Sequence, residues 1–345
     1  MLYLPHPAMV LTTTGSDVLA QAIAEELKRR LPTDLQADPI FVSPQVVRFS
    51  NDNIQVQVPN VRGHVAVIVH TQVPPVNDHL VELFELIAAA RDARAYDIMV
   101  VFPYMPYARS DRKNKPRIST MGVVLPQLIE NLGVKRVLLL DPHDTHIKHY
   151  FRPGADEISA VYLLIDYLQN NFFTTTPREE CTLVFSDEGS SKRFGHVSGM
   201  LKIPTAHIDK TRLDDTERPK AEMMIGDVRG RTAIIIDDEI LTGRTVEEDV
   251  AIIKAAGAAK VIMIAIHAPM DDIKTSATEV INRLERSAVD QFIVTDSIPI
   301  AHKLELSSKI KVLSVAGLLA EAINREVTDQ SLTELHQLEN AGLYR

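Results

Sequence analysis

The feature that most constrains the fold of this chain is a series of short apolar runs separated by stretches of helical periodicity. The runs occupy residues 65–69, 98–102, 137–140, 183–185, 233–236, 261–266 and 292–294, with another at 310–315. Apolar residues recur at helical spacing in 80–91, 121–132, 158–169 and 246–256. Runs that lack alternation are typical of parallel strands covered on both faces. The pattern therefore predicts an α/β protein with mainly parallel sheets flanked by helices.

The length of 345 residues indicates about two domains. The first four runs and the last four each suggest a similar sheet, so we expect a tandem duplication with a boundary near residues 156–165. We assign residues 1–160 to a first domain and 161–315 to a second. A C-terminal helix over about residues 316–345 is expected to join the first domain. In this tail, Ser331 and Glu334 have the spacing of a capping box.

Composition and charge exclude several classes of protein. The chain is 45% hydrophobic and 24% charged, which is ordinary for a globular protein with well-formed cores. A net charge of −9 argues against a general nucleic-acid binder. An apolar run of about 18 residues and an N-terminal signal pattern are both lacking, so we expect no membrane partner and a cytoplasmic location. The single cysteine, Cys181, precludes an internal disulfide framework and is expected to be buried beside a strand.

Polar side chains follow several of the predicted strands at the point where each strand ends. They include Asp141, His143, Asp187, Asp237, Asp238, His267 and Asp296. The carboxyl ends of parallel strands meet at one edge of a sheet, where ligands bind in open α/β folds. The sequence therefore predicts a polar rim on one side of the sheets.

Residues 232–245 combine a buried strand, an acid pair and a loop of phosphate size. Four apolar residues run directly into Asp237 and Asp238. The loop before the next helical pattern consists of Thr242, Gly243, Arg244 and Thr245. A helix start exposes unpaired N–H groups and the positive end of the helix dipole, which suits a phosphate. Two neighbouring carboxylates would place ribose hydroxyls or a divalent ion beside it, although a strand end with solvated acids is the alternative.

Further segments, in matching order over about residues 14–326, resemble the ribose-phosphate diphosphokinases, also called phosphoribosyl diphosphate synthases. They are Phe102-Pro103-Tyr104, the segment from Tyr107 to Lys113, the strand-end His143, Asp209-Lys210 with Arg212, and the Asp237-Asp238 loop. The resemblance implies two tandem type I phosphoribosyltransferase-like domains. It also implies assembly into homo-oligomers, either dimers or hexamers, with the ATP site between subunits. The implied reaction is Mg²⁺-dependent transfer of the β,γ-diphosphoryl group of ATP to the 1-hydroxyl of ribose 5-phosphate.

The resemblance also implies roles for individual residues. Lys210 and Arg212 would be catalytic, on a loop that closes over the transferring group. The ribose 5-phosphate residues would be Asp187, Asp237, Asp238, Thr242, Gly243, Arg244 and Thr245. The nucleotide-binding residues would be Phe49, Asn51, Asn53, Arg109, Ser110, Asp111, Lys113 and His143. His143 from the nucleotide-binding residues and Asp187 from the ribose 5-phosphate residues would also contact the Mg²⁺ that accompanies the substrates.

Departures from the family pattern concentrate on the nucleotide side. The adenine-side turn of the family typically reads Arg-Phe-Ser-Asp-Gly-Glu, whereas residues 48–53 read Arg-Phe-Ser-Asn-Asp-Asn. An ionised carboxylate only accepts hydrogen bonds, but an amide both donates and accepts, so we expect a relaxed or changed nucleotide preference. Ser110 stands where glutamine is usual, and Leu241 where family members often carry an acid.

Two other functions stay open on the sequence alone. The first is a non-catalytic paralogue that regulates a true synthase by assembling with it. Retention of Lys210, Arg212, His143 and Asp187 argues against it, because a binding subunit does not need them all. The second is a phosphoribosyltransferase, because the segment from Leu241 to Thr245 also resembles loops of that class of enzyme. Two domains and the Phe-Pro-Tyr segment argue against that reading.

Overall fold

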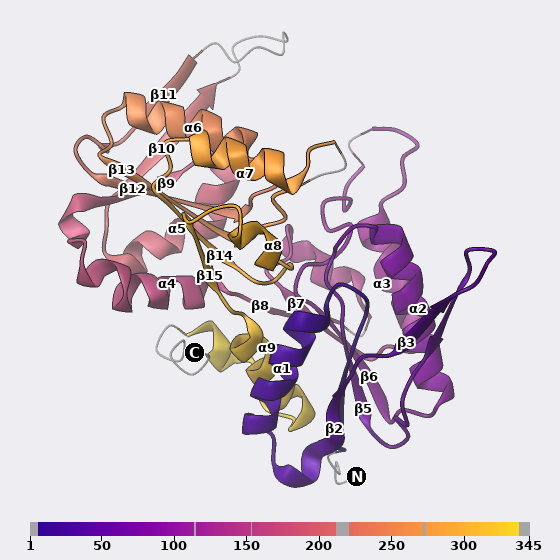
Figure 1. Ribbon diagram of the computed structural model, residues 1–345. Coiled ribbons are helices and arrows are strands. Elements are labelled where there is room, and N and C mark those ends of the chain that lie inside the picture. Colours follow the sequence, from indigo (N-terminus) through magenta and orange to yellow (C-terminus); the bar gives the residue numbers. More distant parts are fainter. Residues whose placement is uncertain (1–5, 114, 153, 212–220, 272–273, 338–345) are drawn as a thin grey trace. The chain divides into compact units, whose positions relative to one another are not determined.

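The computed structural model describes residues 6–113, 115–152, 154–211, 221–271 and 274–337 (Figure 1). The chain divides into two compact units. The first contains residues 1–160, 297–299 and 315–345, and the second contains residues 161–296 and 300–314. Each unit has a mainly parallel sheet with flanking helices, so the predicted α/β class is confirmed. Within the described residues, no helix combines the length and apolar character needed to cross a bilayer.

A six-stranded parallel sheet forms the core of the first unit, in the order β2-β1-β5-β6-β7-β8. Its strands are β1 (Ala8–Thr12), β2 (Gln36–Val42), β5 (Val65–Val69), β6 (Asp97–Phe102), β7 (Arg136–Leu140) and β8 (Asp156–Ile158). Every residue of β1 and β5 is buried, which explains why these segments show no alternation of apolar and polar residues. The helical pattern proposed for 158–169 begins too early, because residues 156–158 pair with β7 and the helix α4 (Val161–Asn170) starts later.

Four α-helices of the first unit are α1 (Asp17–Arg30), α2 (Val76–Asp92), α3 (Met121–Asn131) and α9 (Ala316–Val327). The last of them packs against α1. The capping box expected in the tail is wrong, because the Glu334 carboxylate lies 3.0 Å from the Arg325 guanidinium instead of bonding the Ser331 N–H. A short 3₁₀ turn, Thr333–His336, follows α9 there.

A two-stranded hairpin projects from the first sheet and carries the turn that the sequence assigns to the nucleotide side. It pairs β3 (Gln45–Arg48) with β4 (Ile54–Gln57) in antiparallel register, Arg48 opposite Ile54. Residues 48–53, which the resemblance matches to the adenine-side turn of the family, thus join the two strands of this hairpin.

The second unit is built on a seven-stranded sheet in the order β11-β10-β9-β12-β13-β14-β15. Its strands are β9 (Cys181–Phe185), β10 (Thr205–Thr211), β11 (Ala221–Ile225), β12 (Thr232–Glu239), β13 (Lys260–His267), β14 (Gln291–Thr295) and β15 (Ile310–Leu313). All neighbours are parallel except β10 and β11. Cys181 is buried in β9, as predicted.

The expectation that the first four apolar runs share one sheet is wrong. The fourth run, in β9, pairs with β12 through Cys181 and Thr232 and therefore belongs to the second sheet. An apolar run shows that a strand is buried but not which strand lies beside it, and this pairing joins segments about fifty residues apart along the chain.

The remaining α-helices of the described second unit are α5 (Glu188–Leu201), α6 (Arg244–Ala255), α7 (Ala277–Arg286) and the short α8 (Ala301–Leu304). Figure 1 shows α6 and α7 over one face of the second sheet and α4 and α5 over the other. The apolar residues of β12 are fully covered between these layers.

Candidate functional site

The acid pair of the second unit lies at the carboxyl end of β12, which continues to Glu239. The Asp238 N–H donates to Oδ1 of Asp237 over 2.8 Å. From α5, Nη1 of Arg193 lies 3.5 Å from Oδ2 of Asp238. The two acids therefore differ in environment, because Asp238 has a cation beside it and Asp237 faces mainly other acids. Sequence reasoning gave Arg193 no role, since its partner is visible only after β9 and β12 are paired.

The electrostatic state of Asp237 follows from its position. Burial, followed by the negative charge of Asp238 and a smaller effect of Asp187, raises the pKa of Asp237 to about 8. Near neutral pH and without ligands, this carboxyl is therefore largely protonated. A protonated carboxyl both donates and accepts hydrogen bonds, which suits a sugar hydroxyl.

Asp187 is fixed at the start of α5 by a capping box. Its Oδ1 accepts from the Ser190 N–H over 2.7 Å, and the Ser190 hydroxyl accepts from the Asp187 N–H over 3.2 Å. Because β9 is the parallel neighbour of β12, this carboxylate and the acid pair share one edge of the sheet. The reciprocal cap holds Asp187 in one orientation there.

The loop after β12 is a helix start with a glycine in the left-handed conformation. Gly243 precedes α6 with φ +71°, and a Cβ at this position would lie 2.8 Å from Cδ2 of Leu284. Both the backbone conformation and the lack of space therefore require glycine. Thr242 precedes it, and Arg244 and Thr245 form the first turn of α6. The first N–H groups of an α-helix have no partner within the helix, so this loop can accept an anion.

The proposed catalytic residues lie at the end of β10. Lys210 is in that strand, in register with Glu222 of β11. The Lys210 side chain and the whole of Arg212 lie outside the described residues.

In the first unit, the turn at residues 49–53 closes the β3–β4 hairpin. The Phe49 N–H donates to the Asn53 carbonyl over 2.8 Å, and Oδ1 of Asn51 accepts from the Asn53 N–H over 3.3 Å. Phe49 is 48% exposed, which leaves it accessible to a ligand. Asn51, by contrast, is partly used to shape the turn.

Asp52 occupies the glycine position of the family turn and has φ 71°. Aspartate tolerates this conformation better than most residues. Its carboxylate lies 2.6 Å from Nη1 of Arg48, whose Nη2 lies 3.1 Å from Asp78 at the start of α2. The carboxylates near this turn are therefore engaged with Arg48.

The segment 109–113 follows β6, and hydrogen bonds of Ser110 attach it to the start of α3. The Ser110 hydroxyl accepts from the Met121 N–H over 3.2 Å, and its carbonyl accepts from the Gly122 N–H over 2.9 Å. A Cβ on Gly122 would lie 3.0 Å from that carbonyl, so the approach is close. Ser110 thus has a structural use that the sequence alone did not indicate.

Arg112 links this segment to the turn that carries His143. Its guanidinium lies 3.1 Å from Asp111 and also pairs with Asp144, the residue after His143. Burial would raise the pKa of Asp144, but hydrogen bonds from His146 and the charge of Arg112 lower it to about 2. Arg109, Lys113 and His143 are exposed on the segments that are joined in this way.

The oxygen donors at the strand ends fit Mg²⁺ only as a site shared with substrate and water. Within the described part of the chain, no three His, Cys, Asp or Glu side chains are arranged to hold a metal ion together. Mg²⁺ often uses only one or two protein carboxylates and completes its shell with water and substrate phosphates. The Asp187 carboxylate accepts from the Ser190 N–H through Oδ1, so among the described residues it fits that kind of site with its second oxygen.

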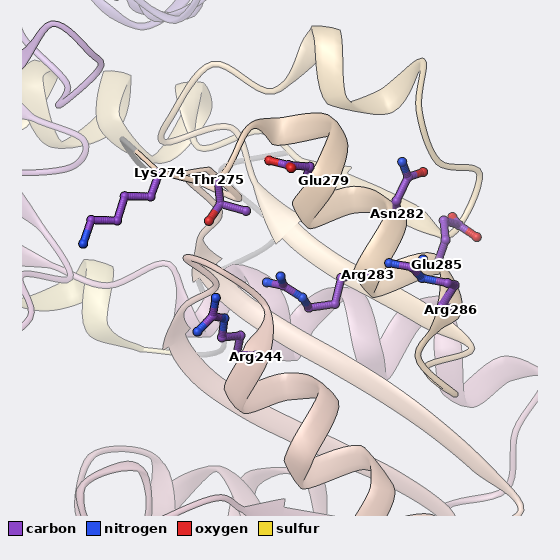
Figure 2. Close-up of a pocket in the computed structure, with 8 residues that line it drawn as sticks. All are labelled: Arg244, Lys274, Thr275, Glu279, Asn282, Arg283, Glu285 and Arg286. Carbon is purple, nitrogen blue, oxygen red and sulfur yellow. The ribbon is translucent and has the colours of Figure 1, made fainter.

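A cavity of about 540 Å³ opens beside the loop on the α7 side. It is lined by Arg244, Lys274, Thr275, Glu279, Asn282, Arg283, Glu285 and Arg286 (Figure 2). Arg283 extends from α7 toward the loop that carries Arg244, and its Nη1 donates to the Thr242 carbonyl over 2.5 Å. Sequence reasoning missed Arg283, because an arginine on an amphipathic helix gives no sign of such a contact.

The fold and the site define an α/β protein of two units whose second unit carries a helix-start loop after a strand-end acid pair. The comparisons with known proteins add a family. Residues 8–133 match the N-terminal domain of ribose phosphate pyrophosphokinase, and residues 198–337 match a phosphoribosyl synthetase-associated domain. The chain therefore belongs to the ribose-phosphate pyrophosphokinase family, as its motifs predicted.

Individual relatives agree over nearly the full length. The ribose-phosphate pyrophosphokinase of Staphylococcus saprophyticus is 35% identical over 332 residues, covering 94% of this chain and 96% of the relative. That of Nitrosomonas europaea is 31% identical over 329 residues, covering 95% and 97%. The crystal structure of phosphoribosylpyrophosphate synthetase from Mycobacterium smegmatis superposes with a TM-score of 0.79 at 27% identity, covering 94% of this chain and 99% of that one.

Proposed function

We propose that this chain transfers the β,γ-diphosphoryl group of ATP to the 1-hydroxyl of ribose 5-phosphate, giving 5-phosphoribosyl 1-diphosphate and AMP. The observation that carries the proposal is the juxtaposition in the second unit of a helix-start loop and two strand-end carboxyls. A phosphate site directly beside hydroxyl-binding groups matches the two ends of ribose 5-phosphate. Membership of the family supports the same substrate.

On the acceptor side, the N–H groups at the start of α6 would bind the 5-phosphate, with Thr242 and Thr245 adding hydroxyl donors. The carboxyls of Asp237 and Asp238 would bind the 2- and 3-hydroxyls. Two fixed attachments define the orientation of the sugar, so the 1-hydroxyl would be presented in one direction.

On the donor side, Phe49 would stack on the adenine ring and the cationic Arg109 and Lys113 would contact the triphosphate. His143, on the turn tied to that segment through Arg112, would contact the same phosphates. Asp111 would act indirectly by holding Arg112. Negative charge on the transferring group increases the need for cations, and Lys210 and Arg212 would supply them as AMP leaves.

We also propose that Mg²⁺ is required. Bound to the substrates, the ion would neutralise phosphate charge and orient the diphosphoryl group for in-line transfer. Asp187 would hold it on the ribose side through its carboxylate, and His143 would lie on the nucleotide side. Because Mg²⁺ prefers oxygen donors, we expect Asp187 to contribute more of the affinity than His143.

The family resemblance supports a homo-oligomer, dimeric or hexameric, with the ATP site completed by a second subunit, and a cytoplasmic location. The 48% exposure of Phe49 agrees with a nucleotide site that is completed by a second surface. A single buried thiol, whose pKa burial raises to about 11, agrees with a reducing compartment.

The proposal is tested by incubating the purified chain with Mg²⁺, ATP and ribose 5-phosphate and separating the products by anion-exchange chromatography. We expect AMP and phosphoribosyl diphosphate in equal amounts, and loss of both when ribose 5-phosphate is omitted. AMP at the level of the enzyme-free control, with each of the four common nucleoside triphosphates, would favour the non-catalytic paralogue. Pyrophosphate-dependent cleavage of a nucleotide without AMP formation from ATP would favour a phosphoribosyltransferase.

A further inference from the structure

The loop proposed to bind the 5-phosphate is backed by α7, an element outside the motifs that point to the function. The Cα of Gly243 faces the buried side chains of Leu284 and Val280, and a Cβ there would lie 2.8 Å and 3.6 Å from their nearest atoms. The loop and the apolar face of α7 are therefore in direct contact with no room between them. A shift of α7 would move the loop.

A polar link adds direction to this contact. Nη1 of Arg283 donates to the Thr242 carbonyl over 2.5 Å, and Nε of the same side chain lies 3.8 Å from Glu247 in the first turn of α6. One planar guanidinium thus holds the residue before the helix start and a residue just after it. Such charge-assisted contacts are stronger than neutral hydrogen bonds.

The bond to the Thr242 carbonyl has a consequence for the adjoining N–H group. In a planar trans peptide the C=O and N–H bonds point in opposite directions. A Thr242 carbonyl held toward α7 therefore directs the Gly243 N–H away from α7. Under the proposed function, this N–H would be one of those that bind the phosphate.

The helix that carries Arg283 is itself held firmly at its start. Ser276 and Glu279 form a complete capping box, with the Ser276 N–H donating to Glu279 over 2.9 Å and the Glu279 N–H donating to Ser276 over 3.3 Å. Arg283 lies one turn further along, and its side chain is only 20% exposed. Arg286 lines the same cavity and is exposed. Figure 2 shows its side chain near the end of α7.

We propose that Arg283 is a positioning residue for the ribose-phosphate loop. It fixes the Thr242–Gly243 peptide so that its N–H and those of α6 converge on the 5-phosphate, without touching the reacting atoms itself. The inference rests on the proposed function for the identity of the ligand, but its structural part concerns the loop alone.

The kinetic test compares Arg283→Met and Arg283→Lys with Arg286→Met, a matched control on the same helix and cavity. We expect Arg283→Met to raise KM for ribose 5-phosphate about 10-fold or more, the size of losing a charge-assisted hydrogen bond, while kcat and KM for ATP change less than about 3-fold. Arg283→Lys should recover part of the loss, because an ammonium can reach one partner but not bridge two. Equal KM values for Arg283→Met and Arg286→Met would overturn the proposal.

A second readout does not depend on catalysis. Hydrogen exchange of a peptide covering residues 241–246 should become faster in Arg283→Met and stay at the wild-type rate in Arg286→Met, with α7 peptides unchanged in both. If the wild-type chain forms no AMP but this exchange pattern appears, the proposed function fails and the positioning role stands. Unchanged exchange in Arg283→Met contradicts the positioning role whatever the activity. Melting curves of the three variants identify any general loss of folding.

Discussion

The two units hold their proposed ligand residues in different ways. In the second unit the site residues are fixed by close packing and by hydrogen bonds to the backbone. Gly243 fits against α7 with no space for a Cβ, and Asp187 is held by a reciprocal cap. In the first unit the residues lie on an exposed hairpin turn and on a charged segment whose ion pairs are largely with each other. A preformed site suits a small rigid ligand such as a sugar phosphate, whereas an open one suits a ligand bound with help from another surface.

This difference predicts where substitutions act. Changes in the second unit should remove sugar-phosphate binding or transfer altogether, because a fixed loop has no alternative arrangement. Changes in the first unit should alter which nucleotide is used. The following substitutions test the contrast, in order of decreasing expected effect.

Lys210→Ala should lower kcat by at least about 100-fold, the usual size for deleting a charge that stabilises the transition state. KM for ribose 5-phosphate should change little, because the loop at the start of α6 stays intact. Steady-state AMP release measures both constants. Lys202→Ala, an exposed lysine after α5, is the control. If kcat of Lys210→Ala falls by less than about 5-fold, as in the control, Lys210 does not contact the transferring group in the transition state.

Gly243→Ala should raise KM for ribose 5-phosphate by about 10-fold or more, since it combines left-handed strain with a 2.8 Å approach to Leu284. KM for ATP should stay near wild type. Gly230→Ala is a matched control, because Gly230 also has a positive φ of 69° but a Cβ there meets no atom within 4 Å. Gly230→Ala should leave KM for ribose 5-phosphate unchanged, because Gly230 precedes β12 whereas Gly243 follows it. An unchanged KM in Gly243→Ala would contradict the role of this loop.

The pair Asn51→Asp with Asn53→Glu should shift nucleotide choice by several-fold toward ATP while leaving KM for ribose 5-phosphate unchanged. Carboxylates restore acceptors at the turn, where Asn51 now bonds the Asn53 N–H. The ratio of kcat/KM for ATP and GTP measures the shift. An identical nucleotide profile in the double variant means that these amides do not read the base.

Asp237→Asn tests the buried carboxyl through stability. The raised pKa means that the folded state keeps this proton up to about pH 8, whereas the unfolded chain releases it near pH 3.8. The stabilising contribution is therefore full below pH 3.8 and is lost as the pH rises through 8. Asparagine resembles the protonated acid, so in metal-free buffer the Tm of the variant relative to wild type should increase by at least about 2 °C between pH 5 and pH 8.

Asp34→Asn, at an exposed position, is the control for that measurement. Its melting temperature relative to wild type should stay constant between pH 5 and pH 8. Wild-type and Asp237→Asn melting temperatures that run parallel across this range contradict the raised pKa.

The apolar runs were sufficient to predict the α/β class and most strands, because buried parallel strands leave an uninterrupted signal. They did not reveal β1, although it has as many residues as β5. They also did not reveal β2, which contains a proline, or β8, which has only three residues. Nor did they reveal that β9 belongs beside β12, since pairing depends on contacts far apart in the chain.

The candidate site shows the same limit. Residues that form a local motif, such as Asp237, Asp238 and Gly243, were found from their spacing. Arg193 and Arg283 were not, because each reaches the motif from another helix through one long side chain. Ser110 stays a predicted nucleotide-binding residue, and nothing in the sequence indicated that its hydroxyl accepts a hydrogen bond at the start of α3.

We propose that ribose 5-phosphate, held at the preformed site of the second unit, accepts a diphosphoryl group from a nucleotide, and product analysis tests this proposal most directly. Anion-exchange chromatography of a reaction with Mg²⁺, ribose 5-phosphate and each nucleoside triphosphate in turn should show one monophosphate formed per phosphoribosyl diphosphate. Dependence on ribose 5-phosphate should be absolute, and more than one nucleotide should serve as donor. Release of a nucleoside diphosphate and inorganic phosphate instead would contradict the proposal. So would the absence of any product that depends on ribose 5-phosphate, with every donor.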